Sequence, residues 1–448
     1  MFHSVLIANR GEIALRIHRA CRTLGLRTIV VYSEADRDAP HVRQADLALC
    51  IGPAPATRSY LNQAAVLFAA QVGGAEAVHP GYGFLSENAE FAARVEAAGL
   101  TFIGPSSAAI RAMGDKVVAK RTMRAAGVPC VPGPDGAVSP DLGEVRAAAR
   151  EIGYPLIIKA AGGGGGRGMR IVNEETGLAD AIALTREEAG RAFGNSEVYL
   201  EKYLGRPRHV EIQVLADQHG TVLALGSRDC SLQRRHQKVL EEAPAPGISP
   251  QLLAEIGDRC VAACRQIGYC GLGTFEFLVE DGAFYFIEMN TRVQVEHTVT
   301  EMVSGLDLVR EQIRVAQGEK LTLTQAAIAC RGHAFECRIN AENPQTFAPS
   351  PGRIAGWQLP GGPGVRIDTH VGPGAVVSSH YDSMIAKLVV HGDSRADALV
   401  RLTAALAEMR VDGIDTNLEL HRSLVRDPAF IEGGVDIHHL ERWLAGSP

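Results

Sequence analysis

Residues 273–297 carry a dense set of side chains that could bind a metal ion and an anion. Apolar residues alternate from Phe275 to Val279, and Asp281-Gly282 supplies turn chemistry before a second β-forming run, which predicts a hairpin. If the second run stays extended, its polar groups share one face, because side chains alternate along a strand. These groups belong to Glu288, Asn290, Arg292, Gln294 and Glu296.

The length of the hairpin loop decides which residues face each other. A two-residue loop would pair Glu276 with Ile287, whereas a three-residue loop, residues 281–283, sets Glu276 opposite Glu288; we expect the three-residue loop. Facing carboxylates repel each other, so such a pair favours a cation between them. Glu276, Glu288 and Asn290 offer oxygen ligands that suit Mg²⁺ or Mn²⁺, with substrate phosphate completing the shell. A solvated hairpin face is the alternative for any single residue, but it explains the set less well.

A second candidate site is the glycine-rich segment 162–168, which lies between two strand-like runs. Consecutive glycines let backbone N–H groups fold around phosphate oxygens without Cβ clashes. No Gly-Lys-Ser/Thr follows, so the segment is not a Walker P-loop. Lys159, at the end of the preceding strand, is well placed as a point charge on a phosphate. A flexible linker is the alternative, but linkers favour serine and charge over flanking apolar strands.

Residues 228–238 are rich in cations and hydrogen-bond donors, among them Gln233, His236 and Lys238. A solvated basic face is the alternative for this segment alone. Beside acidic metal ligands and a glycine loop, it indicates an anion-binding surface. Lys116 leads into a predicted helix capped by Asp115, although alone it is typical of a solvated helix lysine.

The elements that must position these residues begin with a strand at 5–8, a helix at 12–24 and a strand at 28–32, which predict a parallel, Rossmann-like sheet. The first turn lacks Gly-x-Gly-x-x-Gly, which disfavours a dehydrogenase. The turn-rich loop 79–88 is either a ligand-binding loop or a structural turn. Near the other end, a strand at 335–340 places Arg338 on its polar face, where a surface ion pair is the alternative.

Composition limits the class of protein. The 448 residues are 46% hydrophobic and 21% charged, which allows about two to four globular domains. A net charge of −6 argues against nucleic-acid binding. Nine cysteines without a Cys-x-x-Cys pair suggest reduced thiols. With no signal-peptide pattern and no apolar run near the ~20 residues of a membrane span, we expect a soluble cytoplasmic protein with no membrane partner.

The glycine loop with Lys159, the Glu276, Glu288 and Asn290 set, and the Lys116 helix resemble the ATP-grasp ligases. Further blocks resemble the biotin carboxylase family, whose members carboxylate biotin for acetyl-CoA carboxylase, and the resemblance spans nearly the whole chain. These blocks are residues 7–14, 79–88, 234–238, 288–292 and 336–342.

The resemblance implies an α/β and α+β multidomain fold. A Rossmann-like N-terminal domain would occupy residues 1–113 and a helical linker residues 114–130. A mobile ATP-grasp lid with the glycine loop would follow at 131–203. A mixed-sheet C-terminal domain with the metal, bicarbonate and biotin sites would occupy 204–448.

The resemblance also implies residue roles. Bicarbonate would be held by Lys238, Arg292, Gln294 and the Val295 backbone, with Glu296 as its base. Arg338 would steady the biotin enolate, and Tyr82 is a further expected ligand contact. The expected ATP contacts are Lys116, Lys159, Gly164, Gly165, Gly166, Glu201, Lys202, Leu204, His209, Gln233 and His236.

By the same resemblance, ATP and bicarbonate would form carboxyphosphate, and biotin would receive the carboxyl group. The chain lacks Ala-Met-Lys-Met, the family's usual biotin-attachment signature, so we expect a separate biotin carboxyl carrier protein, with carboxyltransferase subunits and a homodimer. We expect a stand-alone subunit of acetyl-CoA carboxylase. The alternatives are a subunit for propionyl-CoA or another acyl-CoA, a different ATP-grasp carboxylate–amine ligase, or an inactive nucleotide-binding scaffold.

Two positions depart from the family pattern. Thr298 stands where proline is usual, and Ser227 where glutamate is usual. Neither residue is among the expected ligands, so these departures bear on loop rigidity more than on chemistry.

Overall fold

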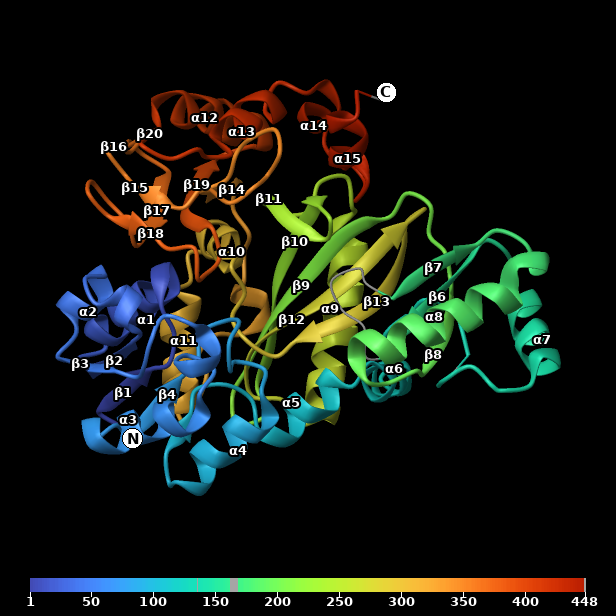
Figure 1. Ribbon diagram of the computed structural model, residues 1–448, viewed down its shortest axis with the longest axis horizontal. Helices are drawn as coiled ribbons and strands as arrows, with labels where there is room; N and C mark the ends of the chain where they lie inside the picture. The colour runs from blue at the N-terminus through green and yellow to red at the C-terminus, as the bar shows by residue number, and fades with distance from the viewer. Residues whose placement is uncertain (135, 162–167, 447–448) are drawn as a thin grey trace.

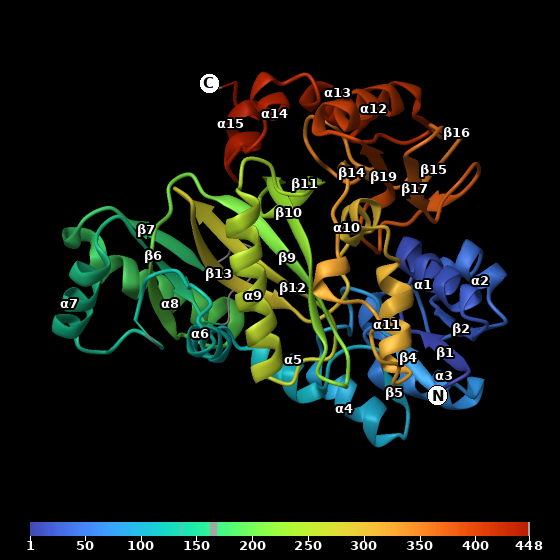
Figure 2. The same cartoon turned by 180° about the vertical axis from the view of Figure 1, so that it is seen from behind.

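The computed structural model describes residues 1–134, 136–161 and 168–446. It confirms a mixed α/β and α+β fold of several sheets. Figure 1 shows the N-terminal parallel sheet on one side, a small sheet with two helices on the opposite side, and a long antiparallel sheet between them. The chain's last helices lie above that long sheet, as the reverse view in Figure 2 also shows.

The N-terminal part forms the expected parallel, Rossmann-like sheet. The side chain of Asn9, which follows the first strand, donates to the carbonyls of Pro80 and Tyr82 at 2.7 and 2.8 Å and so fixes the loop 79–88 against the sheet. In spatial order the strands are β3 (Leu47–Cys50), β2 (Arg27–Tyr32), β1 (Ser4–Ile7), β4 (Ala77–His79) and β5 (Thr101–Phe102). The helices are α1 (Gly11–Thr23), α2 (Pro40–Gln44), α3 (Gln63–Gly73) and α4 (Ala89–Ala97).

Two helices, α5 (Ser107–Gly114) and α6 (Lys116–Ala125), lead out of this unit. Asp115 caps α6 as predicted, because its carboxylate accepts from the backbone N–H groups of Val117 and Val118. A small antiparallel sheet follows, with an apolar core that includes Leu156, Ile158 and Leu200. Its elements are α7 (Leu142–Ile152), β6 (Leu156–Ala160), β7 (Met169–Val172), α8 (Leu178–Phe193) and β8 (Val198–Lys202).

The sheet expected in the C-terminal part is antiparallel throughout rather than mixed, and it carries most of the candidate site. In spatial order its strands are β13 (Ala283–Asn290), β12 (Gly271–Glu280), β9 (Arg208–Ala216), β10 (Val222–Arg234), β11 (Gln237–Ala243), β14 (His333–Asn340), β19 (Met384–Gly392) and β17 (Val365–Thr369). Helix α9 (Pro250–Gln266) contacts β9 and β10, and α12 (Arg395–Glu408) contacts β14 and β19.

The remaining elements surround this sheet. Two short strand pairs are β15 (Gly352–Arg353) with β18 (Val376–Val377), and β16 (Gly356–Gln358) with β20 (Arg410–Asp412). The other helices are α10 (His297–Ser304), α11 (Leu308–Ala316), α13 (Leu418–Leu424), α14 (Pro428–Glu432) and α15 (His439–Leu444).

The predicted hairpin is β12–β13, and the structure corrects its loop. Glu280 pairs with Ala283, so the loop has two residues, Asp281 and Gly282, and the three-residue loop was wrong. Both loop residues have positive φ, 51° and 77°, as a type I′ turn requires. The predicted pairing of Glu276 with Glu288 is nevertheless confirmed, because a β-bulge shifts the register between Glu276 and Phe277.

The alternating face does not continue to Glu296 as an extended strand. β13 ends at Asn290, residues 291–296 form an irregular turn, and α10 begins at His297. Tertiary contacts, rather than strand alternation, must therefore orient Arg292, Gln294 and Glu296.

All nine cysteines lie among the described residues, and none of them forms a disulfide. In the described part of the chain, no helix combines the length and the apolar character needed to cross a membrane.

Candidate active site

A cavity of about 1310 Å³ lies among the small sheet, the long sheet and the N-terminal loop 79–88. Every predicted site residue that the structure describes lines it, whereas Gly164, Gly165 and Gly166 lie outside the described residues. The lining residues expected from the sequence are Tyr82, Lys116, Lys159, Glu201, Lys202, Leu204, His209, Gln233, His236, Lys238, Glu276, Glu288, Asn290, Arg292, Gln294, Val295, Glu296 and Arg338.

The carboxylates of the opposed pair Glu276 and Glu288 differ in the direction of their pKa shifts. Glu276 Oε1 accepts from Asn290 Nδ2 at 2.7 Å and from Gln294 Nε2 at 2.8 Å. Burial raises the pKa of Glu288, and the charge of Glu276 raises it further. For Glu276, burial alone would raise the pKa, but Lys238 and His209 outweigh burial and lower it. A divalent cation between two such carboxylates would relieve their repulsion, so the oxygen-rich set fits Mg²⁺ or Mn²⁺.

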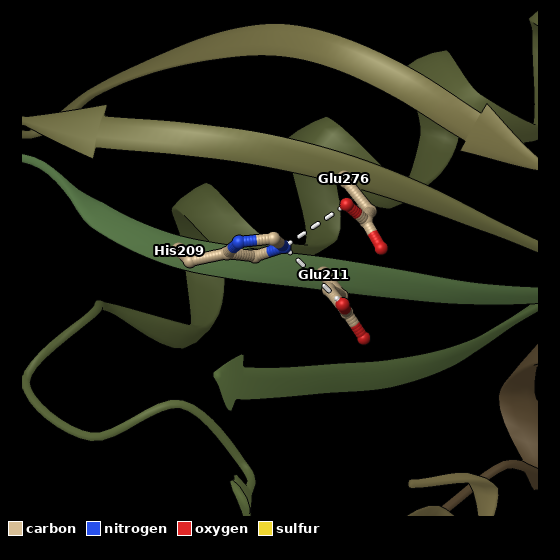
Figure 3. A group of neighbouring side chains, drawn as sticks. All are labelled: His209, Glu211 and Glu276. Atoms are coloured by element: carbon tan, nitrogen blue, oxygen red, sulfur yellow. Dashed lines mark ion pairs between the residues drawn. The ribbon is translucent and has the colours of Figure 1, made fainter. Parts of the chain in front are cut away.

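A second group near Glu276 could also hold a cation. His209 Nε2 lies 3.3 Å from Glu211 Oε1 and 3.2 Å from Glu276 Oε2, and Figure 3 shows the ring pointing at both carboxylates. Burial would lower the pKa of His209, but the carboxylates raise it to about 9. The sequence analysis did not select Glu211, although alternation along β9 places it on the same face as His209.

Lys238, on β11, joins three carboxylates from different strands and from the turn 291–296. Its ammonium donates to Glu276 at 3.0 Å and to Glu296 at 2.6 Å, and it also donates to Glu211. Burial alone would raise the pKa of Glu296, but Lys238 and other cations outweigh burial and lower it. The Glu296 carboxylate is therefore ionised.

Arg338, on β14, is part of this buried cluster rather than of a surface ion pair. Its guanidinium donates to Glu296 at 2.9 Å and to Glu241, on β11, at 2.6 Å. Burial raises the pKa of Glu241, and the charge of Arg338 opposes that rise. Arg338 therefore holds Oε2 of Glu296, while Lys238 holds Oε1.

The loop 79–88, whose role the sequence left open, holds part of the irregular turn. Glu87 accepts from Arg292 Nε at 2.8 Å and from the Thr291 backbone at 3.1 Å. Arg292 also donates to Asn290 at 2.7 Å. Tyr82 of the same loop lines the cavity and donates its hydroxyl to Glu12 of α1.

Arg228, which the sequence analysis did not select, supports the cluster from inside the long sheet. Its side chain is fully buried and donates to Glu211 at 3.0 Å, to Gln213 at 2.7 Å and to Gln294. Its position in the basic segment 228–238 was the only sequence signal. Arg228 thereby neutralises a carboxylate and orients a residue of the turn at once.

The opposite part of the cavity, which we call the lysine end, is lined by Lys116, Lys120, Lys159 and Glu201. Glu201, on β8, lies 2.6 Å from Lys159 of β6 and also pairs with Lys120 of α6. Burial lowers the pKa of Lys159 to about 8 and that of Lys120 to about 7. Lys120 was not predicted, although it lies one helical turn beyond Lys116.

The other predicted residues of this region have distinct settings. Lys202 donates to the Gly153 and Tyr154 carbonyls, both at 3.2 Å, and Leu204 is buried. His236 lies in a two-residue turn between β10 and β11 with a positive φ of 64°, a conformation that costs free energy in a non-glycine residue. The buried side chain of Gln233 lies near that turn.

The two departures from the family pattern are buried and hydrogen-bonded. The hydroxyl of Thr298, in the first turn of α10, donates to Glu336 of β14. Ser227 Oγ accepts from the Ala245 backbone at 3.1 Å. Both residues therefore stabilise local packing, and neither lines the cavity.

We name the second part of the cavity the carboxylate end. It is lined by Glu276, Glu288, Glu296, Lys238 and Arg338, and the buried Glu211 contacts Lys238 from behind that lining.

Three segments of the chain match known protein families. Residues 1–110 match the family described as biotin carboxylase, N-terminal domain, and residues 336–442 match biotin carboxylase C-terminal domain. Residues 115–324 match the ATP-binding domain of the carbamoyl-phosphate synthase L chain.

Similar relatives include biotin carboxylases of Allochromatium vinosum, 62% identical, and Pseudomonas aeruginosa, 60% identical, each over 99% of both chains. A biotin carboxylase–beta-gamma-ATP complex from Campylobacter jejuni is 47% identical with a TM-score of 0.94, covering 99% of both chains. The biotin carboxylase domain dimer of Hydrogenobacter thermophilus 2-oxoglutarate carboxylase, in complex with MgADP, ADP and bicarbonate, is 46% identical with a TM-score of 0.93, covering 99% of this chain and 98% of that one.

Proposed function

The chain belongs to the biotin carboxylase family and catalyses the ATP-dependent carboxylation of biotin, and on that premise we propose that its substrate is biotin attached to a separate carrier protein. The carboxylated carrier then passes to carboxyltransferase subunits, and the pair of reactions makes up acetyl-CoA carboxylase. We also propose a homodimer in the cytoplasm, where cysteines outside disulfides, such as those of this chain, stay reduced.

Bicarbonate is a poor electrophile, so its phosphorylation to carboxyphosphate is the step that consumes ATP. Lys238, Arg292, Gln294 and the Val295 N–H hold bicarbonate, and Glu296 removes its proton. Glu296 suits this role because it is ionised and lies between the Lys238 ammonium at 2.6 Å and the Arg338 guanidinium at 2.9 Å. These cations also stabilise the charge that develops on the reacting oxygens.

Carboxyphosphate then releases CO₂ beside biotin, and the departing phosphate accepts the proton of the ureido nitrogen. Arg338 stabilises the negative charge that develops on the ureido oxygen. Tyr82 lies on the cavity wall contributed by the N-terminal unit, where it limits the space open to biotin. Holding the partners side by side is the main contribution of these residues.

The lysine end suits ATP because Lys120 and Lys159 share the one carboxylate of Glu201. The expected contacts of His209, Gln233 and His236 with phosphates or ribose, and of residues 201–204 with the adenine side, stay predictions. Closure of the lid, residues 131–203, excludes water from the labile intermediate.

The opposed carboxylates of Glu276 and Glu288, with Asn290, are the residues that would hold Mg²⁺ or Mn²⁺. When bound, the ion neutralises charge on the phosphates of ATP.

One observation carries the assignment of roles: a single cavity joins a cation-rich end to Glu296, which is ion-paired with both Lys238 and Arg338. The test is phosphate release from ATP, measured with bicarbonate, with biotin, with both and with neither. We expect fast release only when both are present. Release that needs an amine acceptor and ignores biotin would favour a different ATP-grasp ligase, and ATP binding without release would favour an inactive scaffold.

The downstream acyl-CoA needs a separate experiment. With carrier and carboxyltransferase subunits added, we expect malonyl-CoA from acetyl-CoA. Faster carboxylation of propionyl-CoA would assign the chain to another acyl-CoA carboxylase. Sedimentation at micromolar concentration tests the homodimer.

A further inference from the structure

Lys387, on β19, is a buried lysine that the mechanism above does not use. Its side chain is 0% exposed, and its ammonium lies behind the cavity rather than on its surface. Nζ donates to the Val295 carbonyl at 2.8 Å and lies 3.3 Å from Glu12 of α1. A buried charge costs several kcal/mol unless it is well paired. These two partners therefore explain why the fold tolerates the buried ammonium.

The first partner belongs to the turn that carries the proposed base. The Val295 carbonyl is part of the planar peptide group that joins Val295 to Glu296, so holding this oxygen fixes the direction in which the Glu296 Cα leaves the turn. Residues 291–296 are neither helix nor strand. Contacts from outside the turn must therefore set its orientation, and Lys387 provides one of these contacts through the Val295 carbonyl.

The second partner connects Lys387 with the N-terminal unit. Glu12 accepts a hydrogen bond from the hydroxyl of Tyr82, which lines the cavity. Lys387 thus contacts the turn of Glu296 directly and reaches Tyr82 through one carboxylate. These contacts join the C-terminal sheet, the turn 291–296 and the loop 79–88.

The charges around Lys387 keep its ammonium protonated. Burial alone would lower the pKa of Lys387, but Glu12, Glu336 and Asp368 outweigh burial and the repulsion from Arg366, and they raise it. Glu336 is itself held by the hydroxyl of Thr298, in the first turn after Glu296. The ammonium therefore remains a permanent hydrogen-bond donor to Val295.

We propose that Lys387 is a positioning residue for carboxylation: by holding the Val295 carbonyl and Glu12 together, it sets Glu296 and Tyr82 at their working separation. The proposal rests on the role of Glu296 as base. It differs from a purely structural ion pair, because a structural pair affects the fraction of folded protein without altering turnover of each folded molecule.

The first variant is Lys387→Met, which keeps the length of the side chain and removes its donor. We expect kcat for biotin-dependent phosphate release to fall about tenfold to a hundredfold, the size expected for misplacement of a reacting group by about 1 Å. KM for ATP should change less than about twofold, because the lysine end is formed by other elements.

The second variant separates folding from positioning. In Glu12→Gln/Lys387→Met, no Glu12 carboxylate is left unpaired, so the melting temperature should recover towards that of the unmodified protein. We expect kcat to stay low, since the Val295 carbonyl still lacks its donor. This variant keeps the test decisive where Lys387→Met alone folds poorly.

The matched control is Arg395→Met, which removes a cation just beyond β19. Arg395 donates to Glu242 at 2.7 Å and to the carbonyls of Phe430 and Ile431 at 2.8 and 2.6 Å, all away from the turn. We expect a lower melting temperature with kcat and KM unchanged.

The proposal is overturned if Lys387→Met loses thermal stability but keeps kcat, if the double variant recovers kcat, or if Arg395→Met loses as much kcat as Lys387→Met. Failure of the underlying assignment has a different signature. In that case Glu296→Gln would retain turnover, whatever the Lys387 variants do.

Discussion

The two ends of the cavity hold their charges in opposite ways. At the lysine end, Lys120 and Lys159 share the single carboxylate of Glu201, so positive charge is left in excess. At the carboxylate end, Lys238 alone contacts three carboxylates, and Arg338 adds contacts to Glu241 and Glu296. One end shares one carboxylate between two lysines, whereas the other shares one lysine among three carboxylates.

The two ends therefore contribute to the reaction in different ways. Buried cations in excess of their partners favour the arrival of polyphosphate, so the lysine end gains stabilisation on binding. The ion pairs of Glu296 with Lys238 and Arg338 instead hold reacting groups in place before the substrate arrives, which is the preorganisation that electrostatic catalysis needs. Substitutions at the two ends should therefore affect different measured quantities.

The largest effect is expected for Glu296→Gln. The amide cannot accept the proton of bicarbonate, so kcat should fall about a thousandfold, in the range for loss of a general base. Affinity for ATP, measured by calorimetry, should stay within about twofold because the lysine end is intact. The control is Glu241→Gln, the same change on the other carboxylate of Arg338. An equal loss in the control would attribute the effect to charge balance around Arg338 rather than to a base.

Arg228→Met should break the internal pairing of the carboxylate end. It leaves Glu211 buried without one of its cations, and it removes a donor from Gln213 and from Gln294. We expect the free energy of unfolding to fall by about 3–5 kcal/mol, as for a broken buried pair. Urea denaturation measures this loss. Arg191→Met, which breaks an exposed pair with Glu187, should change it by less than about 1 kcal/mol. Equal losses in the two variants would contradict the importance of the buried network.

Lys159→Met tests whether the lysine end contributes to ATP binding rather than to stability. Glu201 keeps Lys120 as a partner, so the unliganded protein should keep its melting temperature. The dissociation constant for ATP should rise about tenfold to a hundredfold, the value of one or two charge-assisted hydrogen bonds. Arg170→Met, on the next strand of the small sheet, should leave that constant unchanged. A large drop in melting temperature for Lys159→Met would show that this end contributes to stability instead.

The smallest effect concerns pH. Because burial lowers the pKa of Lys159 to about 8 and that of Lys120 to about 7, these side chains lose their protons as pH rises from 7 to 9. ATP binds the protonated forms better, so its affinity should weaken by about tenfold over that range. Calorimetry in buffers of different ionisation heat should also detect proton uptake on binding. In Lys159→Met the dependence on pH should be shallower, and an affinity that is flat from pH 7 to 9 would contradict the expectation.

Local pattern predicted much of the fold and of the site. The strand, helix and strand of the first 32 residues, the cap at Asp115 and the hairpin around Asp281-Gly282 follow from propensities that act over a few residues. The hairpin also shows where local rules stop. Turn chemistry favoured the two-residue loop, and the pairing of Glu276 with Glu288 came from a bulge that no local pattern indicated.

The missed residues share a physical reason. Glu211, Arg228 and Lys120 have no motif, and each matters because of partners far along the chain. Arg228, for example, donates to Thr300, 72 positions away. Such contacts depend on strand order and helix packing, which sequence spacing does not encode.

By itself, the sequence determined the chemical groups available: an acidic pair with an amide, a lysine beside a glycine loop, and a base within a polar run. Only the tertiary structure decided how these groups are joined, because β13 ends at Asn290 and the turn beyond it has no regular hydrogen bonding of its own. Contacts from Glu87, Arg228, Lys238 and Lys387, drawn from distant segments, direct that turn into the cavity.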